Sequence, residues 1–505
     1  MRTLYRATRV YSLSSPAVGE WILIDERHVQ RVGSGTPPEA DRLVELPGAT
    51  IVPGFIDTHV HLTPTGRALA DTDVYGARSR EELLAVAKRR VGETPADEPV
   101  ILQGYDETLW DDPRPPSIED LDELAQRPLV IHRTDGHMAL ANSAAIAAAD
   151  IAAEPGTERA ADGEPTGRIT LEAVHRLDRW ETERLSDNDV QELQLRAAAL
   201  AASRGITCVH EMSMPHEFGI RDLQVFLRQR ERLPIDCVPI VATMDIPQVI
   251  DLGLGTIGGD LPVDGSIGAR TAALAAPYAD GSAFGIAYYD DDELERFFGD
   301  GHGAGLQVGV HAIGDRAIEQ VLTAWERVYQ ALDSRQRRHF RARRHRVEHF
   351  EMTSAGQVER AGMLGLAVSV QPTFDRLWGG AGGLYEIGLG EDRSGSMNPF
   401  RTMLERGVEL GVGSDAPVTP LDPMLTLMAL EGHHDPAQRM SRFEAIRLHT
   451  IGSARLAHHE EKKGALGPGM HADFAAFEVD PFEAETLETV RPILTVSLGR
   501  EVFAA

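Results

Sequence analysis

Four histidines and one aspartate of this chain follow short apolar segments, and their side chains could bind a metal ion or transfer a proton. They are His59, His61, His311, His349 and Asp415. Residues at the carboxyl ends of parallel strands meet on one face of a barrel, so we expect these five side chains to converge. Imidazole and carboxylate groups are ligands of divalent metals, which activate water for attack on a substrate. The pattern therefore predicts a metal-dependent hydrolytic centre.

The spacing of His59 and His61 strengthens this interpretation. Alternate residues of a strand point to the same face, so two histidines that are two residues apart can hold one ion. A single pair of this kind is weak evidence. Here the pair follows an apolar segment, residues 51–57, at the start of a long alternation of strands and helices, which makes it strong.

The middle of the chain alternates apolar segments with helical segments, as is typical of a parallel α/β fold. Eight strand candidates are present, and eight such units predict a TIM (β/α)8 barrel. The fourth candidate is the weakest, because it is rich in glycine. The candidates are residues 51–61, 206–211, 235–243, 256–263, 306–311, 345–350, 366–371 and 408–415.

Two further parts are expected around the barrel, which would span residues 51–464. Both termini contain short alternating strands separated by turn residues, which predicts a small β-sandwich domain from residues 1–50 and 465–505. An insertion at about residues 75–190 follows the first barrel strand. We expect it to form a lid on the catalytic side, where loops control access, although a merely decorative insertion is the alternative.

Composition excludes several classes of function. The 505 residues include 78 acidic and 50 basic ones, which gives a formal charge of −28 and disfavours binding to nucleic acid. No apolar segment reaches the length of a membrane span and no secretory signal is recognisable, so we expect a cytoplasmic protein without membrane association. The two cysteines, Cys208 and Cys237, lie in apolar segments and are expected to be buried thiols.

Several motifs together resemble the amidohydrolase superfamily, in particular amidohydrolase family 3, the branch that includes N-substituted formamide deformylases. The resemblance covers nearly the whole chain, and its motifs are specific in combination. It implies a barrel hydrolase that acts on a small molecule, and we expect a homo-oligomer, a dimer. The matching segments are PGFIDTHVH at 53–61, RTDGH at 133–137, DGSIGARTA at 264–272, HAIGDRA at 311–317, EH at 348–349, QP at 371–372, GSDAPV at 413–418 and GPGMHAD at 467–473.

This resemblance also implies a role for each of the five residues. His59 and His61 would hold the deeper metal position. His311 and His349 would bind a second metal, or one of them would hold the substrate. Asp415 would bind metal and accept the proton of the attacking water, which a carboxylate beside a metal-bound water can do.

One position departs from the family pattern. Relatives with two metals usually bridge them with a carboxylated lysine four residues before an Asp-Gly-Ser motif, and the corresponding residue here is Asp260. An aspartate is shorter than a lysine carbamate, so it either bridges two metals directly or does not reach. Asp260 is therefore a candidate ligand, and we expect one firmly bound zinc ion with a possible second.

Four more residues are candidates for contact with the substrate. Asp135 and His137 in the insertion would face it, and His137 or His349 would help to polarise the reacting carbonyl, although Asp-Gly-His also fits a solvated turn. Trp110 could supply an apolar wall or pack in a core. Arg270 could bind a substrate carbonyl or carboxylate, or form a structural ion pair.

These observations predict a metal-dependent hydrolase that cleaves a non-peptide amide-type C–N bond with metal-activated water. Lactone or ester hydrolysis, deamination and decarboxylation on the same site remain open, because a fold does not choose among them. A non-catalytic scaffold that has lost its metal is the alternative from another class, and the intact set of ligand residues argues against it.

Overall fold

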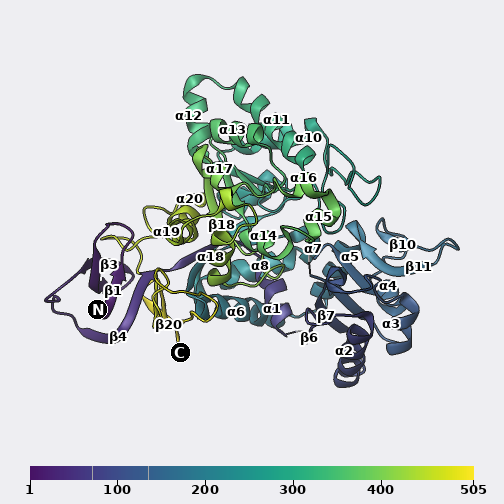
Figure 1. Ribbon diagram of the computed structural model, residues 1–505, viewed down its shortest axis with the longest axis horizontal. Helices are drawn as coiled ribbons and strands as arrows, with labels where there is room; N and C mark the ends of the chain where they lie inside the picture. Colours follow the sequence, from purple (N-terminus) through teal and green to yellow (C-terminus); the bar gives the residue numbers. More distant parts are fainter. Residues whose placement is uncertain (71, 135) are drawn as a thin grey trace.

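The computed structural model describes residues 1–70, 72–134 and 136–505, and its centre is the expected TIM barrel (Figure 1). Eight strands form one parallel sheet in the order β18-β17-β16-β15-β14-β13-β12-β5. Its two edge strands meet through a bridge between Val60 and Ala416, so the sheet closes. The strands are β5 (Phe55–Val60), β12 (Ile206–Ser213), β13 (Asp236–Val241), β14 (Thr256–Ile257), β15 (Gln307–Ala312), β16 (Arg346–His349), β17 (Ala367–Val370) and β18 (Glu409–Val412).

The fourth barrel strand is much shorter than the sequence predicted. β14 contains only Thr256 and Ile257, because Gly258 and Gly259 take positive φ angles of 85° and 59° and turn the chain away. A side chain at Gly258 would lie 2.0 Å from the carbonyl oxygen of Gly309 on the neighbouring strand, so only glycine fits this turn. The turn carries Asp260 to the mouth of the barrel.

Helices cover the outside of the barrel and bury apolar side chains against it. In α11 (Asp315–Ala331), for example, Val321 and Trp325 are buried, and the Trp325 ring stacks on Phe298 of α10 (Asp291–Gly303) with centroids 4.1 Å apart. None of the helices in the described ranges is long and apolar enough to cross a membrane. The others that cover the barrel include α6 (Asp187–Ser203), α8 (Ile220–Gln229), α10 (Asp291–Gly303), α13 (Ala355–Leu364), α17 (Phe400–Glu405), α18 (Pro423–Glu431) and α19 (Arg442–Arg447).

The two termini combine in one seven-stranded sheet, in the order β21-β20-β19-β4-β1-β2-β3, at one end of the molecule (Figure 1). Its strand β4 continues into β5 through Gly54. A Cβ atom at this position would lie 2.2 Å from Oγ1 of Thr207, so the close approach of the two segments requires glycine. The sheet therefore anchors the strand that bears His59 and His61. Its strands are β1 (Arg2–Tyr11), β2 (Val18–Asp25), β3 (His28–Gly33), β4 (Arg42–Pro53), β19 (Phe474–Phe477), β20 (Pro492–Ser497) and β21 (Arg500–Ala504).

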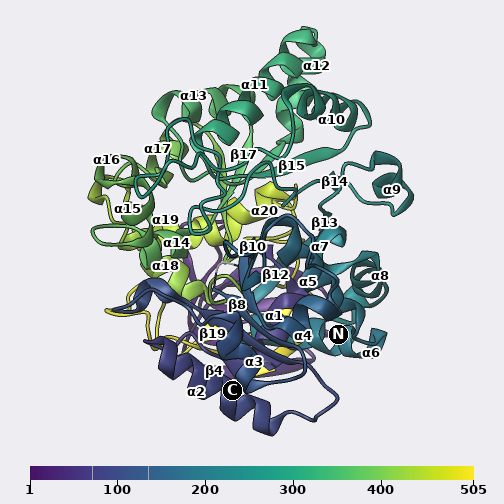
Figure 2. The same ribbon diagram turned by 90° about the vertical axis from the view of Figure 1, so that its right-hand side faces the viewer.

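The inserted segment has its own sheet and lies at the opposite end of the molecule, as Figures 1 and 2 show. Six strands pair in the order β10-β11-β9-β8-β7-β6, with an apolar core that includes Leu102, Leu121 and Ile131. Helix α5 (Leu171–Glu183) packs on α7 (Pro215–Phe218), which follows barrel strand β12. The elements are β6 (Thr72–Asp73), α2 (Arg80–Glu93), β7 (Val100–Tyr105), α3 (Ile118–Leu124), β8 (Leu129–Arg133), β9 (Met138–Ala141), α4 (Ser143–Ala148), β10 (Thr157–Arg159), β11 (Pro165–Thr170) and α5 (Leu171–Glu183).

Candidate metal centre

The carboxyl ends of the barrel strands bring together all four histidines and the aspartate that the sequence singled out. His59 lies in β5 and His61 directly after it, while His311 and His349 lie in β15 and β16. Asp415 follows β18, and its backbone N–H donates to the His59 carbonyl at 2.8 Å. The five side chains are at most 10 % exposed, so they form a buried cluster at the barrel mouth.

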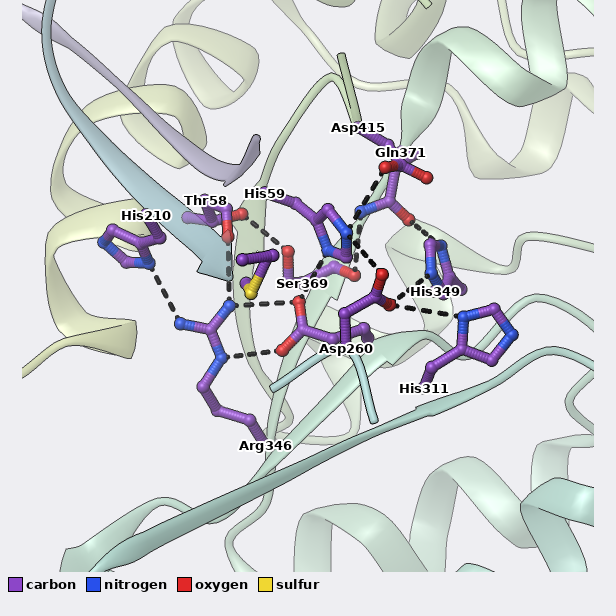
Figure 3. Close-up of polar contacts among 12 residues, drawn as sticks. Thr58, His59, His210, Asp260, His311, Arg346, His349, Ser369, Gln371 and Asp415 are labelled. Atoms are coloured by element: carbon purple, nitrogen blue, oxygen red, sulfur yellow. Dashed lines mark hydrogen bonds and ion pairs between the residues drawn. The ribbon is translucent and has the colours of Figure 1, made fainter. Parts of the chain in front are cut away.

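Asp260 lies in the middle of this cluster, between His59 on one side and His311 and His349 on the other (Figure 3). Its Oδ2 atom is 3.4 Å from Nε2 of His59 and 3.4 Å from Nε2 of His61. Its Oδ1 atom is 3.3 Å from Nδ1 of His311 and 3.3 Å from Nε2 of His349. The short aspartate therefore reaches both pairs, and each pair faces a different carboxylate oxygen.

Asp415 faces the first pair only. Its Oδ1 atom is 3.3 Å from Nε2 of His59 and 3.2 Å from Nε2 of His61. The ligand atoms of His59, His61 and Asp415 thus lie close enough together to share one ion, and so do those of His59, Asp260 and His349. Oδ1 of Asp260 also faces His311, which extends the second position toward that ring.

The spacing of the ligand atoms of His59, His61 and Asp415 fits a metal ion better than direct hydrogen bonds. A hydrogen bond between imidazolium and carboxylate is usually about 2.7–2.9 Å long. Ligand atoms about 2.0–2.2 Å from a tetrahedral ion lie about 3.3–3.5 Å apart, as they do here. Within the described ranges, Nε2 of His59 and Oδ1 of Asp415 are buried without a hydrogen-bond partner, as expected for atoms that bind an ion.

The other ring nitrogens are held by protein acceptors, which orient the rings. Nδ1 of His59 donates to Glu348 Oε2 at 3.0 Å, and Nδ1 of His61 donates to the Met212 carbonyl at 3.0 Å. Nδ1 of His349 donates to Gln371 Oε1 at 2.8 Å. Such contacts select the tautomer whose free nitrogen would face a bound metal ion.

A buried arginine supports the first of these contacts. Arg346 donates to both oxygens of Glu348, at 2.8 and 3.0 Å, and also to Nδ1 of His210 and to the Thr58 carbonyl (Figure 3). Its charge keeps the pKa of Glu348 below the usual range against the opposing effect of burial. Glu348 therefore remains an ionised acceptor for His59.

Charge attraction dominates inside the cluster. Burial disfavours the charged ring of His59, but Asp415 and Asp260 outweigh it and raise the pKa of His59 to about 10. Burial likewise opposes ionisation of Asp260, but His59 and the hydrogen bonds of His311 and His349 hold its pKa well below the usual range. The two carboxylates thus stay ionised and supply negative charge that divalent cations could balance.

Two residues of the cluster have strained backbones. His349 and Asp415 have φ angles of 69° and 57°, a region that side chains other than glycine rarely occupy. The buried carboxylate of Asp57 binds the backbone N–H groups of both His59 and Ser414, which ties the two edge strands together. This clamp fixes Asp415 beside the first histidine pair.

The remaining candidates lie in different places. The His137 ring lies 6.3 Å from the His311 ring and lines the same cavity, whereas Asp135 lies outside the described residues. Trp110 packs in the core of the insertion and donates to the Ala77 carbonyl at 3.0 Å.

Arg270 has the structural surroundings that the sequence left as its alternative. Its guanidinium forms an ion pair with Asp280 at 2.6 Å and donates to the carbonyls of Ile267 and Gly268. It is absent from the cavity lining in the ranges that the structure describes.

Sequence reasoning assigned no role to Arg346 and Glu348, although a signal was present. Opposite charges two residues apart within a short apolar strand share one face, and burial of both requires that they pair. Gln371 offered a weaker signal, because the motif Gln371-Pro372 does not by itself show which histidine the amide contacts.

A cavity of about 570 Å³ opens from this cluster, and residues of both the barrel and the insertion line it. His61, Asp260, His311, His349 and Asp415 all line it, so a bound small molecule would contact the cluster directly. The volume is typical of small-molecule sites.

Comparisons with known proteins agree with this geometry. A family model described as "Amidohydrolase family" matches residues 42–503. The chain is 30% identical to the amidohydrolase YtcJ of Bacillus subtilis (strain 168), over 90% of this chain and 88% of that protein. It is 25% identical to the N-substituted formamide deformylase of Arthrobacter pascens, over 92% and 91% of the two chains.

A solved structure shares the fold. The crystal structure of an uncharacterized metal-dependent hydrolase from Pyrococcus horikoshii OT3 superposes with a TM-score of 0.76 at 25% identity, and the match covers 96% of this chain and 99% of that one.

Proposed function

This chain belongs to the amidohydrolase family, and from that premise we propose that it hydrolyses an amide-type C–N bond outside peptides. Family and structural relatives establish the coarser assignment, a metal-dependent hydrolase. The finer one is supported by the likeness to an N-substituted formamide deformylase, which extends over 92% of this chain. Ester or lactone hydrolysis, deamination and decarboxylation on this site are the alternatives that a substrate panel separates.

The position of Asp260 carries the proposal, because it organises the ligand residues into two sets. His59, His61 and Asp415 would hold one ion, His311 and His349 a second, and Asp260 would contribute one oxygen to each. Nitrogen and carboxylate ligands at these spacings suit zinc. This arrangement favours two ions, whereas the sequence had favoured one firmly bound ion.

Each residue that lines the site would have its own role in the hydrolysis. A divalent ion bound here would supply an activated water and polarise the substrate carbonyl. Asp415 lines the cavity beside the first histidine pair, so its carboxylate can accept a proton from water and return it to the leaving nitrogen. His137 lines the cavity near His311, where it could donate a hydrogen bond to the substrate.

Metal removal tests this proposal. Purified protein should hydrolyse at least one member of a panel of N-substituted formamides, and it should lose that activity after treatment with a chelator. Zinc added back should restore the activity, because the ligand residues are held in place by the barrel. Lactones, esters and amino-heterocycles in the same panel are the controls, and a clear preference for one of these classes would contradict the proposed C–N specificity.

The contact between Glu348 and His59 gives a second prediction. In Glu348→Gln the carboxylate that orients His59 loses its charge, so zinc affinity should fall by about 10–100-fold, as measured by competition with a chromogenic chelator. Glu326→Gln is the matched control, because Glu326 pairs with Arg360 on the outside of the barrel. Equal affinity of the Glu348 variant and wild type would show that the contact is not needed for metal binding.

A further inference from the structure

The cavity beside the candidate ligands contains a buried acid that the proposed chemistry does not use. Glu351 lines the cavity and is only 3 % exposed. One of its oxygens, Oε2, accepts a hydrogen bond from the Tyr385 hydroxyl at 2.5 Å. Among the residues that the structure describes, Oε1 receives no hydrogen bond, and no arginine or lysine pairs with the carboxylate. The hydrogen bond from Tyr385 satisfies one oxygen, but the carboxylate lacks the basic side chain that usually offsets the cost of burying a charge.

Three aromatic rings surround this side of the cavity. Phe374 and Trp378 belong to α14 (Pro372–Trp378), and Tyr385 belongs to α15 (Leu384–Leu389), which lies beside it (Figures 1 and 2). The Phe374 and Trp378 centroids are 4.7 Å apart at 49°, and those of Trp378 and Tyr385 are 6.3 Å apart at 70°. The rings are therefore tilted toward one another instead of stacked, and all three line the cavity.

This aromatic group begins directly beside the candidate metal ligand His349. The Phe374 ring lies parallel to the His349 ring, at an interplanar angle of 10° and a centroid distance of 6.0 Å. A ligand group seated among Phe374, Trp378 and Tyr385 would thus lie next to the bond that the centre acts on.

Aromatic rings and a carboxylate without an arginine or lysine beside it have one ligand chemistry in common. The negative faces of Trp, Tyr and Phe rings attract cations, most strongly where water is excluded. A carboxylate binds an ammonium group through a charge-assisted hydrogen bond. A neutral apolar group would suit the rings but would leave the charge of Glu351 without an adjoining ammonium group.

We infer that Phe374, Trp378, Tyr385 and Glu351 form a subsite for a cationic amine group of the substrate. The inference rests on the proposed function, because it places this group beside the bond that the metal-dependent centre would hydrolyse. It narrows the substrate to an amide whose neighbouring substituent carries a protonated or quaternary amine. The excess of acid in the chain, 78 acidic against 50 basic residues, also favours a cationic ligand.

The test measures binding and not turnover, so that it stands apart from the test of hydrolysis. Benzylammonium and benzyl alcohol have similar size and differ in charge, and benzyltrimethylammonium cannot coordinate a metal. Calorimetry with zinc-loaded protein should show both cations binding about tenfold more tightly than the alcohol. Quenching of tryptophan fluorescence should accompany binding and should weaken in Trp378→Phe, because Trp378 lines the subsite.

Two variants test whether the preference for cations over the alcohol comes from this subsite. In Glu351→Gln, which keeps an acceptor for Tyr385, the preference for the cations should largely disappear. In Asp73→Asn, which alters a carboxylate on the insertion side of the same cavity, it should persist. If the Glu351 variant does not fold, Trp378→Leu should reduce binding of the cations more than binding of the alcohol.

Two results would overturn the inference. One is equal binding of the alcohol and both cations by wild type. The other is a preference for benzylammonium alone that vanishes when zinc is removed, since that would indicate coordination of the amine to the metal. Neither result bears on whether the protein hydrolyses formamides, which the panel with and without metal decides separately.

Discussion

Replacement of Asp415 with asparagine is expected to lower kcat by about 10²–10⁴-fold, the usual contribution of a general base. The amide keeps the shape of the side chain but cannot accept a proton from water. Asp415 is placed for this role, because its Oδ1 atom lies 3.2 Å from His61 Nε2 and the residue lines the cavity. Single-turnover and steady-state rates on the best substrate of the panel would measure the loss.

The Asp415 experiment needs a check on metal content, because Asp415 is also a candidate ligand. Zinc stoichiometry and the circular dichroism spectrum should be recorded for the same preparation, beside Asp251→Asn, a change at an exposed residue of α9 (Ile246–Asp251). A folded, zinc-loaded Asp415 variant with near-normal kcat would move the base to another residue of the cavity.

Wild-type protein is expected to bind two zinc ions per chain, and Asp260→Ala to bind no more than one. Asp260 offers one oxygen to each histidine pair, and the second set contains only His311 and His349 besides it. Loss of the carboxylate should therefore weaken the second set most, since His59 and His61 keep Asp415. Elemental analysis after gel filtration in metal-free buffer measures the stoichiometry.

A matched variant identifies which ion is lost in this experiment. His311→Ala should lose the same ion as Asp260→Ala, while the ion held by His59 and His61 remains. Added bicarbonate should not change the zinc content of wild type, because an aspartate needs no carboxylation to act as a bridge. One ion in both wild type and Asp260→Ala would restore the expectation of a single firmly bound metal.

The eight barrel strands could be predicted from the sequence because the signal is local. Each is a short apolar segment that ends beside a turn or a ligand-type residue, and period-two geometry alone places His59 and His61 on one face. The same reasoning foresaw that His311, His349 and Asp415 would join them, since parallel strands share one carboxyl edge. The predicted length of β14 was wrong, because two glycines with positive φ end the strand earlier than its apolar residues suggest.

Features that depend on distances between segments far apart in the chain were determined only by the tertiary structure. Asp260 reaches four histidines because the turn at Gly258 and Gly259 directs it inward, and its reach depends on strand ends 51 and 89 residues later in the chain. No local pattern reveals that distance.

The contact partners of individual side chains likewise could not be predicted from the sequence. Arg270 could have bound a substrate or an acid of the protein, and only the fold brings Asp280 to it. Glu351 meets Tyr385 across 34 residues, and it lines a cavity whose walls come from separate segments of the chain. The sequence thus determined which strands deliver metal-binding side chains to one edge, because periodicity is a local property. The fold determined which atoms meet there, because a contact between distant segments depends on how the whole barrel closes.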